Sequence, residues 1–354
     1  MSTANRHTDA WTPRRIPDQT GRTAVVTGAN TGIGYATARE LAARGAEVVL
    51  ACRSAARGRA AVERLRAEVP GARVETWELD LASLRSVRRF AERWGGRRLD
   101  LLVNNAGVVA VPDVPTEDGF EPHFGVNHLG TFALTGLLLP VLTAAPAPRV
   151  VTVSSEYQRF VRLDPRRGTE QLRRGGAMQA YGRSKQANVY FAAELQRRAD
   201  RHGQRLRSMV AIPGMTDTGV LGRGANSGRG VLWRKVLVPL VHAVAKPVEQ
   251  GAWPTLYAAT DPDLPGGSCI APSGPLQSFG RPVPSDGFRA MRDEATARWL
   301  WSLSERLTGV AYEETATGEP AVLGEPGMPE PGQRRRGQGP AGPAPDPRSG
   351  PRTP

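Results

Sequence analysis

Short apolar runs alternate with segments of helical composition through the first part of the chain. Arg22–Thr27, Glu47–Ala51 and Leu99–Val103 are rich in aliphatic residues and short enough to be buried strands. Between the first two runs, Tyr35–Arg44 has helical composition and is followed by Gly45. Continuous apolar strands joined by helices are typical of parallel sheets that are covered on both faces. The pattern therefore predicts an α/β fold built on a doubly wound parallel sheet.

Glycines cluster between the first predicted strand and its helix. Residues 27–34 read Thr-Gly-Ala-Asn-Thr-Gly-Ile-Gly, which is G-x-x-x-G-x-G rather than G-x-G-x-x-G. A bare backbone at this turn can approach a pyrophosphate, and the positive end of the helix faces the negative charge. The segment predicts a dinucleotide site; the alternative is a turn that only joins strand to helix.

The end of the second predicted strand bears on the choice of nicotinamide cofactor. A carboxylate there would bind the ribose 2′-hydroxyl of NAD, whereas an arginine would pair with the 2′-phosphate of NADP. This chain has Cys52-Arg53 at that point, and Arg57 follows one helical turn later. The pattern favours NADP(H) over NAD(H); the alternative is that Arg53 is an ordinary surface arginine.

Tyr181 and Lys185 lie four residues apart, so on a helix they share one face. A free tyrosine has a pKa of about 10, and a fixed cation beside it would lower that pKa toward a useful range. Lys185 is one of only three lysines, with Lys235 and Lys246, in an arginine-rich chain. The pair predicts a general acid/base, although this spacing also occurs by chance.

Taken in order, these motifs resemble those of the short-chain dehydrogenase/reductase family. The resemblance is closest to the branch of retinol dehydrogenases and WW-domain oxidoreductases, which protochlorophyllide reductases also resemble. It runs from about Arg22 to about Val310 and implies a single Rossmann-fold domain over residues 21–312. A flexible N-terminus is expected at 1–20, a substrate loop at about 214–247, and a disordered Pro/Gly-rich tail at 313–354.

The resemblance also assigns site residues. The implied catalytic set is Asn127, Ser155, Tyr181 and Lys185. The implied cofactor contacts are Gly28, Asn30, Thr31, Gly32, Ile33, Gly34, Arg53, Asp80, Leu81, Asn104, Ala106, Gly107, Tyr181, Lys185, Pro213, Gly214, Thr216 and Thr218. In this family pattern the tyrosine transfers the proton, the serine holds the reacting oxygen, the lysine also binds the nicotinamide ribose, and the asparagine holds a water.

Two departures from the family pattern stand out. The segment between Ser155 and Tyr181 is longer than in most members, as in the retinol-dehydrogenase-like branch. Ala211-Ile212 precedes Pro213, where that branch usually has a histidine. Because of this difference, the resemblance does not fix the hydrogen bonds of the segment that begins at Pro213 and is expected to contact the nicotinamide.

Substrate choice is expected to lie in the loop after Pro213-Gly214. Its run Val236–Val241 is apolar, which fits a helix packed on the core, a pocket wall over an apolar substrate, or shallow membrane contact. The chain is predicted to be an NADP(H)-dependent oxidoreductase that interconverts an alcohol and a carbonyl on an apolar small molecule. The alternative is a non-catalytic dinucleotide sensor or partner-binding protein on the same fold. A helix is expected from about Ser285 to Leu307.

Composition bears on which kinds of binding partner can be expected. The net charge of +13 comes from arginines dispersed among glutamates without interleaved aromatics, so specific nucleic-acid binding is not expected. Neither two cysteines nor five scattered histidines give a disulfide framework or a metal site. No signal peptide or membrane-spanning stretch is evident, and a cytoplasmic protein, with a possible homodimer, is expected.

Overall fold

The computed structural model describes residues 11–215 and 247–312. All of them belong to one compact unit that ends at Pro320, and a second unit, Ala321–Pro354, lies outside the described residues. The predicted tail at 313–354 and most of the predicted substrate loop also lie outside them.

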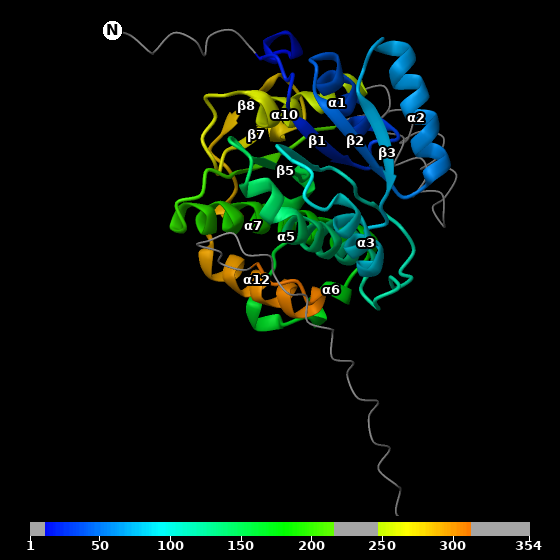
Figure 1. Cartoon of the computed structure of the whole chain (residues 1–354). Coiled ribbons are helices and arrows are strands. Elements are labelled where there is room, and N and C mark those ends of the chain that lie inside the picture. Colours follow the sequence, from blue (N-terminus) through cyan, green and yellow to red (C-terminus); the bar gives the residue numbers. More distant parts are fainter. Residues whose placement is uncertain (1–10, 216–246, 313–354) are drawn as a thin grey trace, which may run out of the picture. The chain divides into compact units, whose positions relative to one another are not determined.

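An eight-stranded sheet forms the centre of the fold, in the order β3-β2-β1-β4-β5-β6-β7-β8 (Figure 1). The strands are β1 (Thr23–Thr27), β2 (Glu47–Cys52), β3 (Val74–Glu78), β4 (Leu101–Asn104), β5 (Arg149–Val153), β6 (Arg207–Ala211), β7 (Cys269–Pro272) and β8 (Pro282–Ser285). The first seven run parallel, and β8 pairs antiparallel with β7. Strand order reverses between β1 and β4, so their carboxyl ends flank the crevice where ligands bind in such sheets. The predicted doubly wound fold is confirmed.

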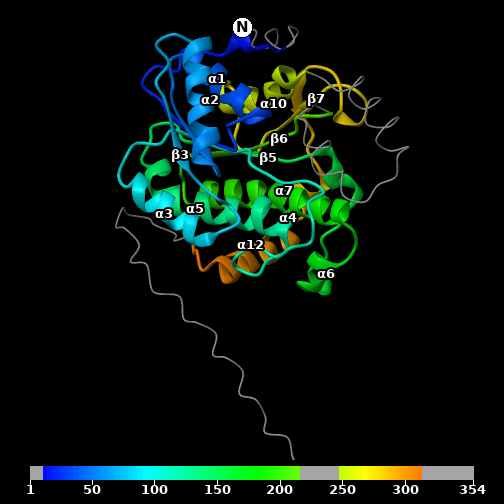
Figure 2. The same cartoon turned by 90° about the vertical axis from the view of Figure 1, so that its right-hand side faces the viewer.

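Helices cover both faces of the sheet (Figure 2). The helices α1 (Gly32–Ala43), α2 (Ala55–Glu68) and α10 (Val248–Thr260) share one apolar core with the sheet. The helices α3 (Leu84–Trp94), α5 (Gly130–Thr143) and α7 (Ala177–Arg201) share a second core on the other face. Every residue of β1, β4 and β5 is buried, as expected of parallel strands between two helical layers.

Short elements connect these parts. They are η1 (Pro13–Arg15), α4 (Pro122–Phe124), η2 (Gly125–Leu129), η3 (Glu156–Phe160), η4 (Pro165–Arg167), α6 (Glu170–Arg173), η6 (Pro275–Gln277) and α11 (Arg289–Arg292). The last helix, α12 (Glu294–Thr308), packs on α7. Of these, η2 is a π-helical turn that joins α4 to α5.

The expectation of a flexible N-terminus is wrong for residues 11–20. Trp11 stacks on Tyr257 of α10 with ring centroids 5.1 Å apart, and Ile16 is buried. The Arg44 side chain donates to the carbonyl oxygens of Pro13 and Ile16 at 2.9 and 3.1 Å. Two apolar side chains and a cation at the end of α1 therefore fasten this segment to the domain.

The helix expected from Ser285 to Leu307 is interrupted. Residues up to Ser285 pair in β8, α11 is a single turn, and α12 begins only at Glu294. The Asp293 carboxylate accepts hydrogen bonds from the backbone N–H and the hydroxyl of Thr296 at 3.1 and 2.9 Å. An aspartate in this role is an N-cap, so it begins a new helix rather than continuing an old one.

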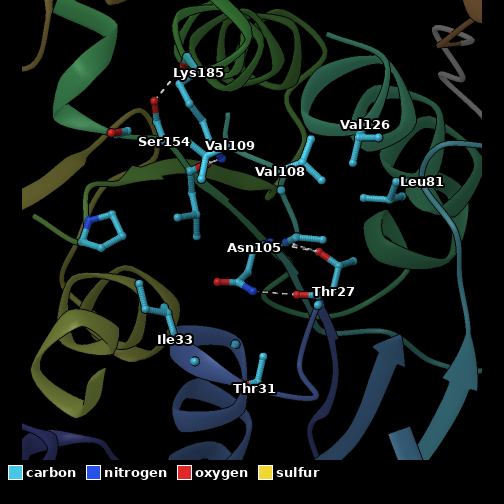
Figure 3. A pocket seen from close by; sticks show the side chains of 18 of the residues that line it. Thr27, Thr31, Ile33, Leu81, Asn105, Val108, Val109, Val126, Ser154 and Lys185 are labelled. Carbon is cyan, nitrogen blue, oxygen red and sulfur yellow. Dashed lines mark hydrogen bonds between the residues drawn. The ribbon is translucent and has the colours of Figure 1, made fainter. Parts of the chain in front are cut away.

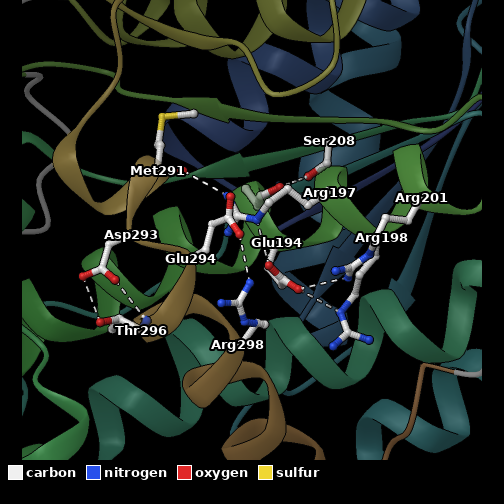
Figure 4. Close-up of polar contacts among 11 residues, drawn as sticks. Glu194, Arg197, Arg198, Arg201, Ser208, Met291, Asp293, Glu294, Thr296 and Arg298 are labelled. Carbon is white, nitrogen blue, oxygen red and sulfur yellow. Dashed lines mark hydrogen bonds and ion pairs between the residues drawn. The ribbon is translucent and has the colours of Figure 1, made fainter.

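Some of the many arginines of this chain pair with one buried carboxylate (Figure 4). Glu194 of α7 is fully buried and forms ion pairs with Arg197, Arg198 and Arg201 at 2.9, 3.2 and 3.4 Å. Arg197 also donates to the carbonyl oxygen of Met291 at 3.0 Å. The cluster therefore compensates a charge that would be costly to bury alone, and it ties α7 to α11.

The helical stretch Pro122–Thr143 is long and apolar enough to cross a membrane by length and composition alone, which the sequence expectation overlooked. However, 78% of its most apolar window is buried inside the protein. The stretch includes η2 and α5, which pack in the core beneath the sheet. Its apolar character is accounted for by that packing.

His128, in η2, makes stability depend on pH. Burial lowers the pKa of His128 to about 3, and its Nε2 lies 2.8 Å from the Ser304 hydroxyl. The unfolded chain takes up a proton near pH 6.5 while the folded chain does not, so stability is lost as the pH falls from 6.5 toward 3.

Between about pH 7 and pH 5 we expect the free energy of unfolding to drop by about 2 kcal/mol because of His128. Urea denaturation at both pH values measures the drop; His128→Gln should flatten it, whereas substitution of the exposed His202 should not. An equally steep drop in His128→Gln would contradict this assignment.

Candidate active site

A pocket of about 540 Å³ opens at the carboxyl ends of β1, β2, β4 and β5 (Figure 3). Thr31 and Ile33 lie at one end of it, and Ser154 and Lys185 lie at the other. Its lining therefore joins the glycine turn to the residues predicted to be catalytic. The lining includes these predicted residues: Gly28, Asn30, Thr31, Gly32, Ile33, Gly34, Arg53, Asp80, Leu81, Ala106, Gly107, Ser155, Tyr181, Lys185, Pro213 and Gly214.

Two glycines of this turn have different roles. One leaves open space where a ligand could bind, and the other allows the chain to pack closely against its neighbours. Gly32 has a φ of +62°, and a Cβ added there would meet no atom within 4 Å, so its bare backbone faces open space. A Cβ on Gly34 would lie 2.5 Å from the Asn105 side chain and 2.7 Å from the Gly28 carbonyl oxygen. The first N–H groups of α1 have no partner within the helix. A diphosphate fits this cradle, because it needs close backbone approach and free N–H donors.

Thr27 and Asn105 hold the turn against the next strand. The Thr27 hydroxyl accepts hydrogen bonds from the N–H groups of Asn105 and Ala106 at 3.0 and 2.9 Å. The Asn105 side chain donates to the Thr27 carbonyl oxygen at 2.8 Å. These bonds join the carboxyl ends of β1 and β4, and they fix the floor of the pocket.

Asn104 is placed differently from its prediction. Its side chain is buried and donates to the Thr135 hydroxyl of α5 at 2.9 Å, and it does not line the pocket. Alternate residues of a strand point to opposite faces, so Asn104 turns toward α5. Its neighbour Asn105, which was not predicted, lines the pocket instead.

Next to the ends of β2 and β3, the pocket is lined by two arginines and one carboxylate. Arg53 and Arg57 are exposed, and both line the pocket. The Asp80 carboxylate accepts a hydrogen bond from the Ala82 N–H at 3.0 Å, which fixes its orientation. Among the described lining residues, therefore, positive side chains stand where the second strand ends.

Asn127 connects the pocket wall to the catalytic helix. It is fully buried in η2, where its oxygen accepts from the Val108 N–H at 2.7 Å. Its amide nitrogen donates to the Val108 carbonyl oxygen at 3.0 Å and to the Ser184 hydroxyl at 2.8 Å. The Ser184 hydroxyl donates in turn to the Tyr181 carbonyl oxygen at 2.7 Å. Asn127 therefore lies behind the pocket wall and braces α7 next to Tyr181.

Tyr181 and Ser155 come together from α7 and the end of β5. Burial raises the pKa of Tyr181 to about 12, while its hydrogen bond with Ser155 opposes that rise and the charge of Glu156 adds to it. The Ser155 hydroxyl also accepts from the Tyr157 N–H at 3.2 Å. The expected lowering of the Tyr181 pKa by Lys185 is not found; burial sets the direction of the shift.

Lys185 lies deep in the pocket. Its ammonium group donates to the Val153 carbonyl oxygen at 3.1 Å, and burial lowers the pKa of Lys185 to about 8. The Ser154 hydroxyl donates to the Lys185 carbonyl oxygen at 2.7 Å, which holds this turn of α7 against β5. A Cβ on Gly107 would lie 3.2 Å from the ammonium and 3.1 Å from the Asn127 side-chain oxygen. Lys185 and Asn127 thus meet behind Gly107.

The segment Pro213–Met215 closes the pocket as far as the structure describes it. Pro213, Gly214 and Met215 line the pocket, and the Met215 N–H donates to the Ser278 carbonyl oxygen at 3.0 Å. Gly214 has a φ of +75°, and a Cβ there would lie 2.5 Å from the same oxygen. The predicted contacts Thr216 and Thr218 lie outside the described residues.

The sequence matches a family model described as short chain dehydrogenase over residues 22–226. The chain belongs to this family. The match covers the glycine turn, the Asn127 region and the Tyr181–Lys185 pair.

Individual relatives place this short-chain dehydrogenase within its family. It is 42% identical to the polyprenol dehydrogenase of Mus musculus over 307 residues, which cover 84% of this chain and 87% of that protein. It is 40% identical to the WW domain-containing oxidoreductase of Homo sapiens over 299 residues, covering 82% and 69%. Human retinol dehydrogenase 13 is 39% identical over 292 residues, covering 82% and 85%. The predicted resemblance to the retinol-dehydrogenase-like branch is confirmed.

Solved structures agree. An uncharacterised protein from Mycobacterium paratuberculosis has a TM-score of 0.70 at 41% identity, covering 86% of this chain and all of that one. A short chain dehydrogenase from Shigella flexneri complexed with NADP has a TM-score of 0.53 at 25% identity, covering 69% and 93%. This short-chain dehydrogenase is therefore an NAD(P)-dependent oxidoreductase that acts on CH–OH groups.

Several lining residues of the dehydrogenase were not predicted from the sequence. They include the apolar side chains of Val108, Val109, Val126, Val153 and Met178, and the Tyr157 ring. The Val-Val pair directly after Asn104–Gly107 was the available signal, since residues after a strand's carboxyl end line the crevice. Among the described residues, no group of three His, Cys, Asp or Glu side chains could hold a metal ion.

Proposed function

We propose that the protein uses NADP(H) to interconvert an alcohol and a carbonyl group on an apolar small molecule, with Tyr181 as the general acid/base. The observation that carries the proposal is that Ser155, Tyr181 and Lys185 line the same pocket as the glycine cradle. A bound nicotinamide cofactor would give or take the hydride; the residues of this chain must handle the oxygen and its proton.

Tyr181 is suited to donate a proton in the direction of reduction. With a pKa of about 12 its phenol stays protonated at neutral pH, and it can pass the proton to a carbonyl oxygen on which negative charge develops. The Ser155 hydroxyl, bonded to the same phenol, can hold that oxygen with a second hydrogen bond. In the direction of oxidation the phenol must first lose its proton, so alkaline pH favours that direction.

Lys185 supports the charge that Tyr181 would carry after donating its proton. A buried ammonium with a pKa of about 8 is still mostly charged at neutral pH, so it can stabilise a nearby phenolate. Its position beside Asn127, behind Gly107, also suits it to bind a ribose hydroxyl in the pocket. Lys185 is therefore proposed to position the cofactor and to balance the charge on Tyr181.

Two arginines and no strand-end carboxylate support a preference for NADP(H). A guanidinium pairs well with a 2′-phosphate, and hydrogen bonds between charged groups are worth about 1.5–3 kcal/mol.

We expect Arg53→Ala to raise the Kd of NADPH about tenfold to hundredfold while changing that of NADH less than about twofold. Titration of protein fluorescence with each cofactor measures both constants. Arg59→Ala, an exposed arginine on α2 that does not line the pocket, is the matched control. Equal losses for the two cofactors would remove Arg53 from this role.

The lining supports an apolar substrate. Val108, Val109, Val126 and Met178 line the pocket with Tyr181. Apolar walls with a few convergent polar groups are typical of sites for small apolar ligands. The names of the relatives that act on polyprenol and retinol point in the same direction.

A panel of aldehydes, ketones and alcohols of increasing chain length tests the function, with NADPH consumption followed by absorbance. The proposal predicts turnover of apolar aldehydes or ketones, with kcat/KM rising with chain length. A protein that binds NADPH but turns over no member of the panel would instead support the non-catalytic sensor.

A further inference from the structure

The structure has a second hollow, of about 440 Å³. Arg159 of η3 lines it, together with residues from η6, from the segment before α11 and from the start of α11. The same short helix begins at Glu156, which lines the active-site pocket. A 3₁₀-helix rises about 2 Å per residue, so Arg159 stands on the order of 8 Å from Ser155 along this helix. A ligand that followed this helix out of the active site would reach Arg159.

The Arg159 guanidinium is held in place from three sides. Its Nε donates to the Glu156 carbonyl oxygen at 3.2 Å, and its Nη2 donates to the Gln277 side-chain oxygen at 3.1 Å. The Phe288 ring lies beneath it, with 5.8 Å between Cζ and the ring centroid. Gln277 is itself fixed by a 2.7 Å hydrogen bond to Ser285. A side chain fixed in this way loses little entropy when it binds a ligand.

The turn that carries Gln277 is strained. Leu276 and Gln277 have φ values of +53° and +57°, in the left-handed region that non-glycine residues avoid. In this conformation the Gln277 side-chain oxygen accepts a hydrogen bond from Arg159, and Leu276 is 64% exposed. Two consecutive strained residues at the rim of a hollow are typical of a functional site rather than of an ordinary connection.

Among the described residues, two arginines and no carboxylate line the hollow. Arg289, which is exposed, lines it together with Arg159. No carboxylate pairs with either arginine within residues 11–215 and 247–312. By contrast, the exposed Arg166 and Arg298 are paired with Asp164 and Glu294. Two fixed or neighbouring guanidinium groups without a counter-charge favour an anion.

We propose that the substrate is amphipathic, with an apolar body at the catalytic end and a carboxylate or phosphate group bound by Arg159 and Arg289. This inference rests on the proposed function, because it identifies the far end of the molecule that Tyr181 and Ser155 act upon. Phe160 follows Arg159 in the sequence and Leu276 lines the hollow, and the exposed side chains of both provide apolar surface for the substrate chain. The anionic group then fixes how far the chain reaches, and so which carbon meets Tyr181.

Paired substrates of equal length test the proposal by activity. We expect wild-type kcat/KM with NADPH to be at least tenfold higher for ω-oxodecanoate than for its methyl ester, with the difference mainly in KM. Arg159→Gln should lose this preference, Arg289→Gln should reduce it, and Arg298→Gln, an exposed arginine on α12, should leave it unchanged. Equal kcat/KM for acid and ester in the wild type would overturn the inference while leaving the proposed function intact.

Calorimetric binding to the full chain gives a readout that does not depend on turnover. Decanoate and decyl phosphate separate the two anionic groups, and decanol is the neutral probe. We expect at least one of the anions to bind at least tenfold more tightly than decanol, and this advantage to disappear in Arg159→Gln. If the advantage is present but no aldehyde is reduced, the anion site stands and the proposed function fails. An advantage that is absent, or that survives in Arg159→Gln, refutes the site.

Discussion

Tyr181→Phe is expected to lower kcat by about 10²–10⁴-fold in the direction of reduction, because the variant keeps the ring and loses the proton donor. The affinity for NADPH should change little, since the glycine cradle and Lys185 are untouched. Single-turnover kinetics measure the loss, and fluorescence titration with NADPH measures binding.

Tyr157→Phe is the matched control for that substitution. Its ring lies in the same pocket, 6.2 Å from the Tyr181 ring between centroids. It should retain most of the wild-type kcat, because the Tyr181 phenol and Ser155 remain in place. If Tyr181→Phe kept its activity, or if both variants lost it equally, another group would have to supply the proton.

Asn127→Leu is expected to destabilise the protein and to disturb catalysis together. The substitution removes two donated and one accepted hydrogen bond at a fully buried position, leaving Val108 and Ser184 unsatisfied. We expect the free energy of unfolding to fall by about 3–5 kcal/mol. The kcat of the remaining folded protein should fall by about 10²-fold, because the wall at Val108 and the Ser184 brace of Tyr181 both shift.

Asn188→Leu separates the two effects. Asn188 is also buried on α7, but it does not line the pocket and makes no hydrogen bond to Val108 or Ser184. We expect a smaller loss of stability and a nearly normal kcat. Urea denaturation and steady-state kinetics on both variants measure the contrast; a kcat in Asn127→Leu equal to that in Asn188→Leu would show that Asn127 acts only on stability.

The fold and the position of the site were predictable because they depend on local patterns. Apolar runs such as Leu99–Val103 identify strands buried on both faces, and glycines at a strand-to-helix turn identify the crevice. Each of these signals consists of residues that are close together in the chain. The structure places nearly all of the cofactor and catalytic predictions around one pocket.

The remaining features depend on contacts between distant segments. Nothing near Trp11 in the sequence indicates that it stacks on Tyr257, and the choice between Asn104 and Asn105 follows from which face of β4 each side chain takes. The Tyr181 pKa shows the same limit: the helical spacing gives the neighbouring cation, but burial decides the direction of the shift. The Gln277 contact that fixes Arg159 spans 118 residues.

The antiparallel strand β8 also affects how the protein behaves at high concentration. The Arg281 carbonyl oxygen accepts a hydrogen bond from the Ser273 N–H. Because the two strands pair antiparallel, the backbone N–H and C=O groups of odd-numbered residues in β8 point toward β7, and those of even-numbered residues point away from it. The outward positions are Pro282 and Pro284, and proline has no amide hydrogen to donate. A further strand from another molecule would find no donors along this border of the sheet, which protects it against edge-to-edge aggregation.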